Sequence, residues 1–262
     1  MLPRSTVVAE ATLRSKFSSS SPALVATLTD VDDIHQHRNL QGGGARAAVF
    51  GVSDGLVSNV ALILGVAGAQ SSGGAVRLAG LAGLIGGAFS MAAGEYVSMR
   101  AQSELVQREL DLERHAIRHQ PDDERRELAA IYKERGLEPE LADELSVEMM
   151  RDPELALETH AREELGINPE ETGNPYQAAA ASFVMFSIGA LVPLLPWLIT
   201  SGTVATLWSV ILGSVGAVVV GAALAHFTGR GRLWSAGRQL LISGGAAAVT
   251  YSIGHLIGHG GA

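Results

Sequence analysis

The sequence contains no cysteine, and aromatic residues make up only 5% of its 262 positions. The lack of cysteine excludes disulfide frameworks, thiolate metal sites and cysteine nucleophiles. Charge is also scarce, at 18% of residues against 47% that are hydrophobic, and no Asp, Glu, Lys or Arg occurs between Thr172 and Gly229. A water-soluble helix needs a polar face, so such a long uncharged run excludes an ordinary soluble enzyme.

Basic residues are few, and they form no stripe. The chain has 19 Lys and Arg against 27 Asp and Glu, which gives a net charge of −8. Because no basic surface is present to neutralise a phosphate backbone, we expect no nucleic-acid partner. Most of the acidic residues lie in one segment, between Ala101 and Tyr176. This distribution predicts a membrane protein whose apolar part is interrupted by a charged insert.

The apolar segments predict an all-α fold with a five-span transmembrane helical bundle. At a rise of about 1.5 Å per residue, about 20 apolar residues cross a hydrocarbon core of about 30 Å. The uncharged run is too long for one span, and it divides at 195–203, where proline, serine and glycine occur. The predicted spans lie between Arg46 and Arg77, and at 78–99, 176–199, 204–227 and 239–262.

The chain therefore divides into four parts. These are a tail at 1–41, spans one and two at 42–99, an acidic helical domain at 100–173, and spans three to five at 174–262. Proline and glycine predict where the helices of the acidic domain break. The breaks fall at Gln120-Pro121, Gly136, Pro139 and Asp152-Pro153. We expect four helices there, the first of them continuous with the second span.

Arginines in the short loops set the expected orientation. Almost all of them fall on one side of the five-span topology, and only Arg77 falls on the other. By the positive-inside rule, the N-terminus and the acidic insert face the cytosol and the C-terminus lies outside. The arginines on the cytosolic side are Arg38, Arg46, Arg100, Arg230, Arg232 and Arg238.

Two carboxylic acids, Asp54 and Glu95, lie inside the predicted spans. A charged group at bilayer depth costs about 2.5–3.5 kcal/mol on insertion scales, which favours a functional role. Met91 lies four residues before Glu95 and shares its helix face. A carboxylate and a thioether facing one axis suit Fe²⁺ or Mn²⁺ better than Ca²⁺ or Mg²⁺. The alternatives are that Asp54 caps its helix, Glu95 reaches the interface and Met91 only packs.

Small residues recur in the second span at four-residue spacing. They are Ala79, Gly83 and Gly87. Such a pattern lets helices approach closely, so this span is expected to pack against a neighbour in the same chain or in a second copy.

The acidic insert carries candidate metal ligands at helical spacing. The pairs are Glu109 with Glu113, Glu124 with Glu127, and His160 with Glu164. Residues three or four apart share a helix face. Glu and His side chains on facing helices hold one or two transition metals in ferritin-like proteins, so we predict a cytosolic, ferritin-like metal-binding insert. The alternative for each pair is a solvated helix face, which is normally charged.

Four motifs stand in order along the chain. They are Gly51-Val-Ser-Asp54-Gly55-Leu56, Phe89-Ser90-Met91-Ala-Ala-Gly94-Glu95-Tyr96, Arg162-Glu163-Glu164-Leu165-Gly166 and Gly189-Ala-Leu-Val-Pro193-Leu-Leu-Pro196. Together they resemble the vacuolar iron transporter family of iron and manganese transporters, over nearly everything from Arg38 onward. The resemblance implies five membrane helices per subunit and a homodimer with the ion path at its axis. It also implies export of Fe²⁺ or Mn²⁺ from the cytosol in exchange for protons.

The resemblance also implies roles for individual residues. Asp54 and Met91 would be the ion-path ligands. Gly83 stands where the family has a glutamate, so Glu95 is a candidate for part of that role. In the insert, His160 stands where the family has methionine and Ala116 replaces a further glutamate, so we expect a variant metal site. The insert residues that match family metal ligands are Glu113, Glu124, Glu127 and Glu164.

We therefore expect a transporter, not an enzyme, that moves Fe²⁺ or Mn²⁺ out of the cytosol, into an organelle or out of the cell. No tightly bound cofactor is expected, and the partners are the transported ion, membrane lipid and a second copy. The membrane would be the plasma membrane of a prokaryote, or the vacuolar membrane or another endomembrane of a eukaryote.

Two alternatives stay open. One is a membrane-anchored di-iron ferroxidase or rubrerythrin-like enzyme, which normally needs two Glu-x-x-His motifs. The insert contains none of these motifs. The other is a metal-buffering membrane protein, which would leave Asp54 and Met91 without a role.

Overall fold

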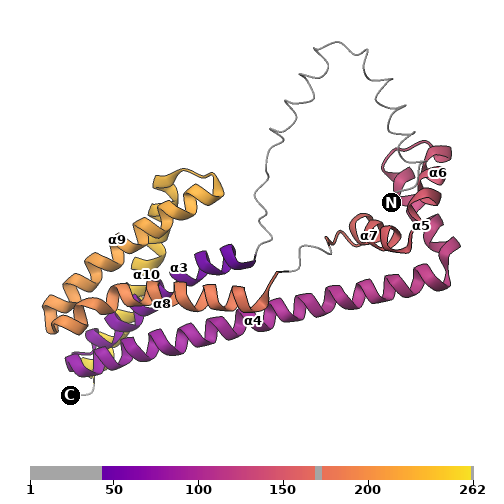
Figure 1. Ribbon diagram of the computed structural model, residues 1–262. Helices are drawn as coiled ribbons and strands as arrows, with labels where there is room; N and C mark the ends of the chain where they lie inside the picture. Colours follow the sequence, from indigo (N-terminus) through magenta and orange to yellow (C-terminus); the bar gives the residue numbers. More distant parts are fainter. Residues whose placement is uncertain (1–42, 169–172, 261–262) are drawn as a thin grey trace, which may run out of the picture. The chain divides into compact units, whose positions relative to one another are not determined.

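The structure, a computed structural model, describes residues 43–168 and 173–260 (Figure 1). In these ranges it contains α-helices and no β-strand, which confirms the all-α fold class. The predicted tail at 1–41 lies outside the described residues. The helices are α3 (Gly43–Gly68), α4 (Gly73–His119), α5 (Pro121–Glu134), α6 (Pro139–Met149), α7 (Pro153–Glu163), α8 (Pro175–Ile199), α9 (Gly202–Thr228) and α10 (Arg232–Gly260).

Five helices of the described part, α3, α4, α8, α9 and α10, are long and apolar enough to cross a membrane, which confirms the predicted number of spans. Two of them, α4 and α10, begin five or more residues earlier than the apolar spans expected from the sequence. Helix α4 starts at Gly73, because the Ser72 hydroxyl caps it by accepting a hydrogen bond from Ala75 N at 3.3 Å. Helix α10 starts at Arg232, shortly after Gly229 ends α9 in a left-handed conformation (φ 66°). Charged residues near these ends therefore limit the apolar span but not the helix.

The helices of the insert break where proline and glycine predict. Proline begins α5, α6 and α7, a position at which its missing N–H removes no helical hydrogen bond. Asp152 caps α7, since its Oδ1 accepts a hydrogen bond from Glu154 N at 2.8 Å. Helix α4 runs without interruption over 47 residues. Its apolar first half and its charged second half thus form one helix, which confirms that the first insert helix continues the second span.

Helix α3 is central to the apolar bundle and packs most extensively against α8. The two helices approach each other at backbone distance. A Cβ added to Gly55 would lie 2.1 Å from the carbonyl oxygen of Phe186, and one added to Gly189 would lie 2.2 Å from that of Val52. Since the neighbouring atoms are backbone, no larger residue fits at either position. This contact sets the position of α3, the helix that carries Asp54, relative to α8.

The small residues of α4 face α3 and α8. A Cβ added to Gly83 would lie 2.5 Å from Leu62 Cδ2, and one added to Gly87 would lie 2.3 Å from the Phe186 ring. The expected packing of the second span therefore occurs within the chain. It brings α4 alongside α3 at the level of the two predicted ion-path residues, Asp54 and Met91.

Candidate metal centre and ion path

Four ligand-type side chains come together where α4, α5 and α7 meet. Glu113, Glu124, His160 and Glu164 each offer one atom, and these atoms lie within 4.8 Å of one another. His160 is fully buried, and its Nδ1 lies 3.2 Å from Glu113 Oε1 and 3.3 Å from Glu164 Oε2. The Oε2 atom of Glu124 lies 3.9 Å from the same nitrogen. Three carboxylates thus surround one imidazole, and we refer to these four residues as the insert cluster.

The insert cluster disfavours the charge of two of its carboxylates, Glu113 and Glu124. Burial, followed by the charges of Glu164 and Glu124, raises the pKa of Glu113 to about 7. Burial is also the largest cause that raises the pKa of Glu124. The buried Nε2 atom of His160 has no hydrogen-bond partner among the described residues, and Glu113 Oε1 makes the 3.2 Å ion pair with His160 Nδ1. A divalent cation would offset the repulsion between the carboxylates, and oxygen ligands with one imidazole suit Fe²⁺ or Mn²⁺.

Two predicted ligands stay outside the insert cluster. Glu127 is exposed, although its charge contributes to the raised pKa of both Glu113 and Glu124. Glu109 is half-buried and lies one turn before Glu113 on α4. Neither is among the residues whose ligand atoms converge. Their role as metal ligands stays a prediction that this geometry does not favour.

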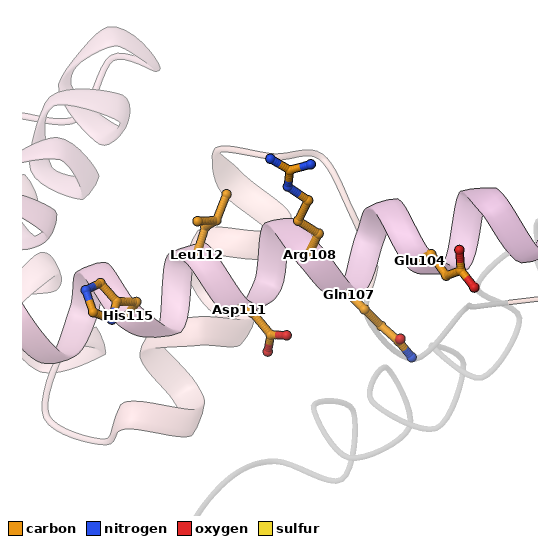
Figure 2. A pocket seen from close by; sticks show the side chains of 6 residues that line it. All are labelled: Glu104, Gln107, Arg108, Asp111, Leu112 and His115. Atoms are coloured by element: carbon orange, nitrogen blue, oxygen red, sulfur yellow. The ribbon is translucent and has the colours of Figure 1, made fainter.

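A second group of ionisable side chains, on the charged half of α4, does not form a metal site. Glu104, Asp111 and His115 line a shallow concavity of about 530 Å³ on the charged half of the helix. Figure 2 shows that the lining side chains follow one stretch of α4, with Arg108 and Leu112 pointing toward one edge of the helix and Gln107 and Asp111 toward the other. Each acid pairs with an arginine of the same helix: Glu104 with Arg100 at 2.8 Å, and Asp111 with Arg114 at 2.6 Å. This surface is an ordinary solvated helix face.

In the bundle, two adjoining grooves lie between α3 and α4, and Asp54 and Met91 line both of them. One groove, of about 290 Å³, also contains Ser58, Asn59 and Gly83. The other groove, of about 390 Å³, is lined in addition by Arg46, Phe50, Ser53, Val57, Glu95 and Ile242. The carboxylate and the thioether, which come from two different helices, thus line the same open grooves. We call the 290 Å³ groove, with its lining residues, the ion groove.

Asp54 and Glu95 have different surroundings. Asp54 lies inside α3, so it does not cap the helix, and its carboxylate makes no hydrogen bond or ion pair with the described residues. Glu95 is paired, because its Oε1 lies 3.6 Å from Arg46 Nη2. Only 17% of the Glu95 side chain is exposed. Asp54 is therefore the free intramembrane carboxylate of the two.

Comparison with known proteins agrees with this arrangement. The VIT family profile matches residues 45–255, which include α4 with both of its halves. The chain belongs to the VIT family. It is 35% identical over 229 residues to a vacuolar iron transporter of Acanthamoeba castellanii, covering 85% of this chain and 82% of that protein.

Plant relatives are similar over the same length. Vacuolar iron transporter 1 of Oryza sativa subsp. japonica is 33% identical over 84% of this chain and 88% of its own. Vacuolar iron transporter 1 of Arabidopsis thaliana is 30% identical over 87% of this chain and 92% of its own. The identified family is therefore the one that the sequence motifs resemble. The roles of individual residues in this VIT protein stay predictions.

The raised pKa of Glu113 predicts how pH affects the metal-free insert of this VIT protein. Between the ordinary value of 4.5 and about 7, the folded state holds a proton that the unfolded state has released. The stability of the metal-free insert should therefore fall as pH rises through this window. Hydrogen exchange of α5 and α7 amides, measured at several pH values with a chelator present, checks this. Adding Mn²⁺ should restore protection at the upper end, because the cation replaces the proton.

The Glu113→Gln variant is the control for this prediction. Glutamine keeps the shape of the side chain but cannot ionise, so the loss of protection with rising pH should become smaller. If the variant and the wild-type protein lose protection equally, Glu113 is not the group responsible.

Proposed function

We propose that this protein is a transporter that moves Fe²⁺ or Mn²⁺ out of the cytosol, across the membrane of a vacuole or another endomembrane compartment. The observation that carries the proposal is the pairing of Asp54 and Met91 across the ion groove, from two membrane-spanning helices. Support also comes from the relatives, which are named vacuolar iron transporters. An unpaired carboxylate in an apolar bundle is energetically costly, and a bound cation would offset that cost.

The two side chains also indicate which ions fit. A carboxylate oxygen and a thioether sulfur favour a divalent ion of intermediate softness, such as Fe²⁺ or Mn²⁺, over Ca²⁺ and Mg²⁺. Protonation of Asp54 would weaken its hold on the ion. Release of the metal on one side of the membrane would then be coupled to uptake of a proton there, which is the physical basis of the proposed proton exchange.

We further propose that two copies form a homodimer with the ion groove between them. Both grooves between α3 and α4 open at the surface of the single chain, which would leave a dehydrated ion in contact with lipid. Large apolar side chains that line the grooves are exposed in the single chain, at 62% for Phe50 and 38% for Leu62. A second copy would cover these side chains and close the path, and lipid would cover the remaining apolar surface.

In this proposal the insert faces the cytosol and collects ions. The arginines near the cytosolic ends of the spans support this orientation. The acidic surface raises the local concentration of cations, and the insert cluster offers them a buried site. Delivery to Asp54 and Met91 would follow along the second span.

An oxidase function is less well supported. A ferritin-like di-iron centre uses two Glu-x-x-His motifs. Among the described residues the insert cluster contains one histidine, His160, with three carboxylates. That set is too small to hold two iron ions in the ferritin-like manner. Oxygen consumption on addition of Fe²⁺ would nevertheless identify an oxidase directly.

Reconstitution into lipid vesicles tests the proposed function. Purified full-length protein should carry Fe²⁺ and Mn²⁺ into vesicles that enclose a metal-sensitive dye, faster than protein-free vesicles do. An outward proton gradient should increase the rate if protons are exchanged. No uptake of either ion above the protein-free background, under any gradient, would contradict the proposal.

A further inference from the structure

Asn59 is a buried residue that lines the ion groove, and only one of the two polar atoms of its side-chain amide has a hydrogen-bond partner among the described residues. The residue lies on α3 and is only 1% exposed. Its Nδ2 donates a hydrogen bond to the carbonyl oxygen of Ala190 on α8 at 2.6 Å. Since a carbonyl oxygen can only accept, this contact fixes the orientation of the amide. The other end, Oδ1, is buried and has no hydrogen-bond partner among the described residues.

The free oxygen faces the side of the groove formed by α4. A Cβ added to Gly83 would lie 2.9 Å from Oδ1, so the two positions face each other directly. Glycine at this position leaves the oxygen without a covering side chain from α4. The nearest atom to that added Cβ is Leu62 Cδ2 at 2.5 Å, the end of a flexible side chain. Asn59 is one of the residues that line this groove, together with Asp54 and Met91.

A purely structural role does not account for this oxygen. Ser209 also bonds to a carbonyl of α8, donating to Pro193 O at 2.6 Å, and it leaves no orphaned atom. Joining α8 to a neighbouring helix thus does not require an amide. Leaving a buried acceptor unpaired is unfavourable, and more so where lipid surrounds the protein. An occupant of the groove with positive charge would satisfy it.

We propose that Asn59 Oδ1 is a neutral ligand for the divalent cation, placed after Asp54 along the ion groove. The inference rests on the proposed transport function. Asn59 follows Asp54 by five positions, which is about 7.5 Å along the helix axis. The ion would pass from a charged ligand to an uncharged one. Conduction requires binding sites that are strong enough to be entered and weak enough to be left, and an amide oxygen holds a dication less tightly than a carboxylate.

Uptake of Mn²⁺ into vesicles by the full-length Asn59→Leu variant tests this proposal. Leucine has a similar size but no oxygen, so the uptake rate should fall by at least about tenfold. Ser209→Ala is the matched control, because it removes an equally short bond to α8 outside the groove. This control should keep most of the wild-type rate. The Fe²⁺ rate should fall in parallel with the Mn²⁺ rate in Asn59→Leu.

A second variant covers the case in which Asn59→Leu does not fold. The natural chain has no cysteine, so Asn59→Cys introduces a single thiol. Cd²⁺ binds thiolates tightly. If this position contacts the ion, Cd²⁺ should block Mn²⁺ uptake by Asn59→Cys at a concentration at least about tenfold lower than in the wild-type protein. Ser209→Cys should remain as insensitive as the wild type.

The outcomes separate this inference from the proposed function. Wild-type rates in Asn59→Leu, or unchanged Cd²⁺ sensitivity in Asn59→Cys, would overturn the role of Asn59 and leave transport itself intact. Absence of uptake by the wild-type protein would overturn transport, and the inference would fail with it.

Discussion

Replacing Asp54 by alanine should reduce metal uptake to less than about one tenth of the wild-type rate, since the only free intramembrane carboxylate among the described residues would be lost. The ion groove would then offer a thioether and neutral oxygens only. These do not compensate a dication that has left water. The measurement is the initial rate of Fe²⁺ and Mn²⁺ uptake into vesicles.

Two further variants make the Asp54 prediction specific. Ser187→Ala removes a hydroxyl of α8 that donates to the backbone oxygen of Phe183 and lines neither groove, and it leaves the Asp54 carboxylate intact. It should retain most of the wild-type rate. Asp54→Asn keeps the volume and removes the charge, so it should be nearly as slow as Asp54→Ala. If Asp54→Ala is as fast as Ser187→Ala, the carboxylate does not contact the transported ion.

The membrane spans could be predicted from composition because lipid imposes one simple requirement. A span needs about 20 apolar residues, and charges mark where it ends. Helix contacts follow a different rule. The small residues at four-residue spacing directed attention to α4, while backbone approaches as close join α3 to α8 through Gly55 and Gly189, and α3 to α10 through Gly254. Which glycine meets which backbone depends on crossing angles, and these are set by all the helices together.

The residues of the candidate sites could likewise be predicted only in part. Spacing predicts that Glu124 and Glu127 share a broad helix face, but a few tens of degrees of rotation decide which one points inward. In the structure Glu124 is buried in the insert cluster and Glu127 is exposed. Asn59 carries no charge, so the rule that a charged group inside a span indicates function does not single it out. A buried amide in an apolar segment is the signal that would have revealed it.

The insert cluster provides the second large expected effect. His160 is fully buried and its Nδ1 lies within 3.9 Å of three carboxylates, so His160→Leu should weaken metal binding by the insert by about 10–100-fold. Leucine would also leave the buried carboxylates beside an apolar side chain. Equilibrium binding of Mn²⁺ to the detergent-solubilised protein, in competition with a chelator of known affinity, measures the change.

Glu127→Gln is the control that separates the observed geometry from the resemblance to the family. The geometry places Glu127 outside the converging atoms. This variant should therefore lose at most about threefold in metal affinity, because it removes only one nearby negative charge. The resemblance instead counts Glu127 among the ligands and predicts a loss as large as that of His160→Leu. Equal losses in the two variants would mean that the metal draws α5 inward and completes the site with Glu127.

The transport rate should depend on the metal concentration in both cases, because a weaker insert lowers the capture of scarce metal but leaves Asp54 in place. Uptake by His160→Leu should therefore approach the wild-type rate once the metal concentration is high.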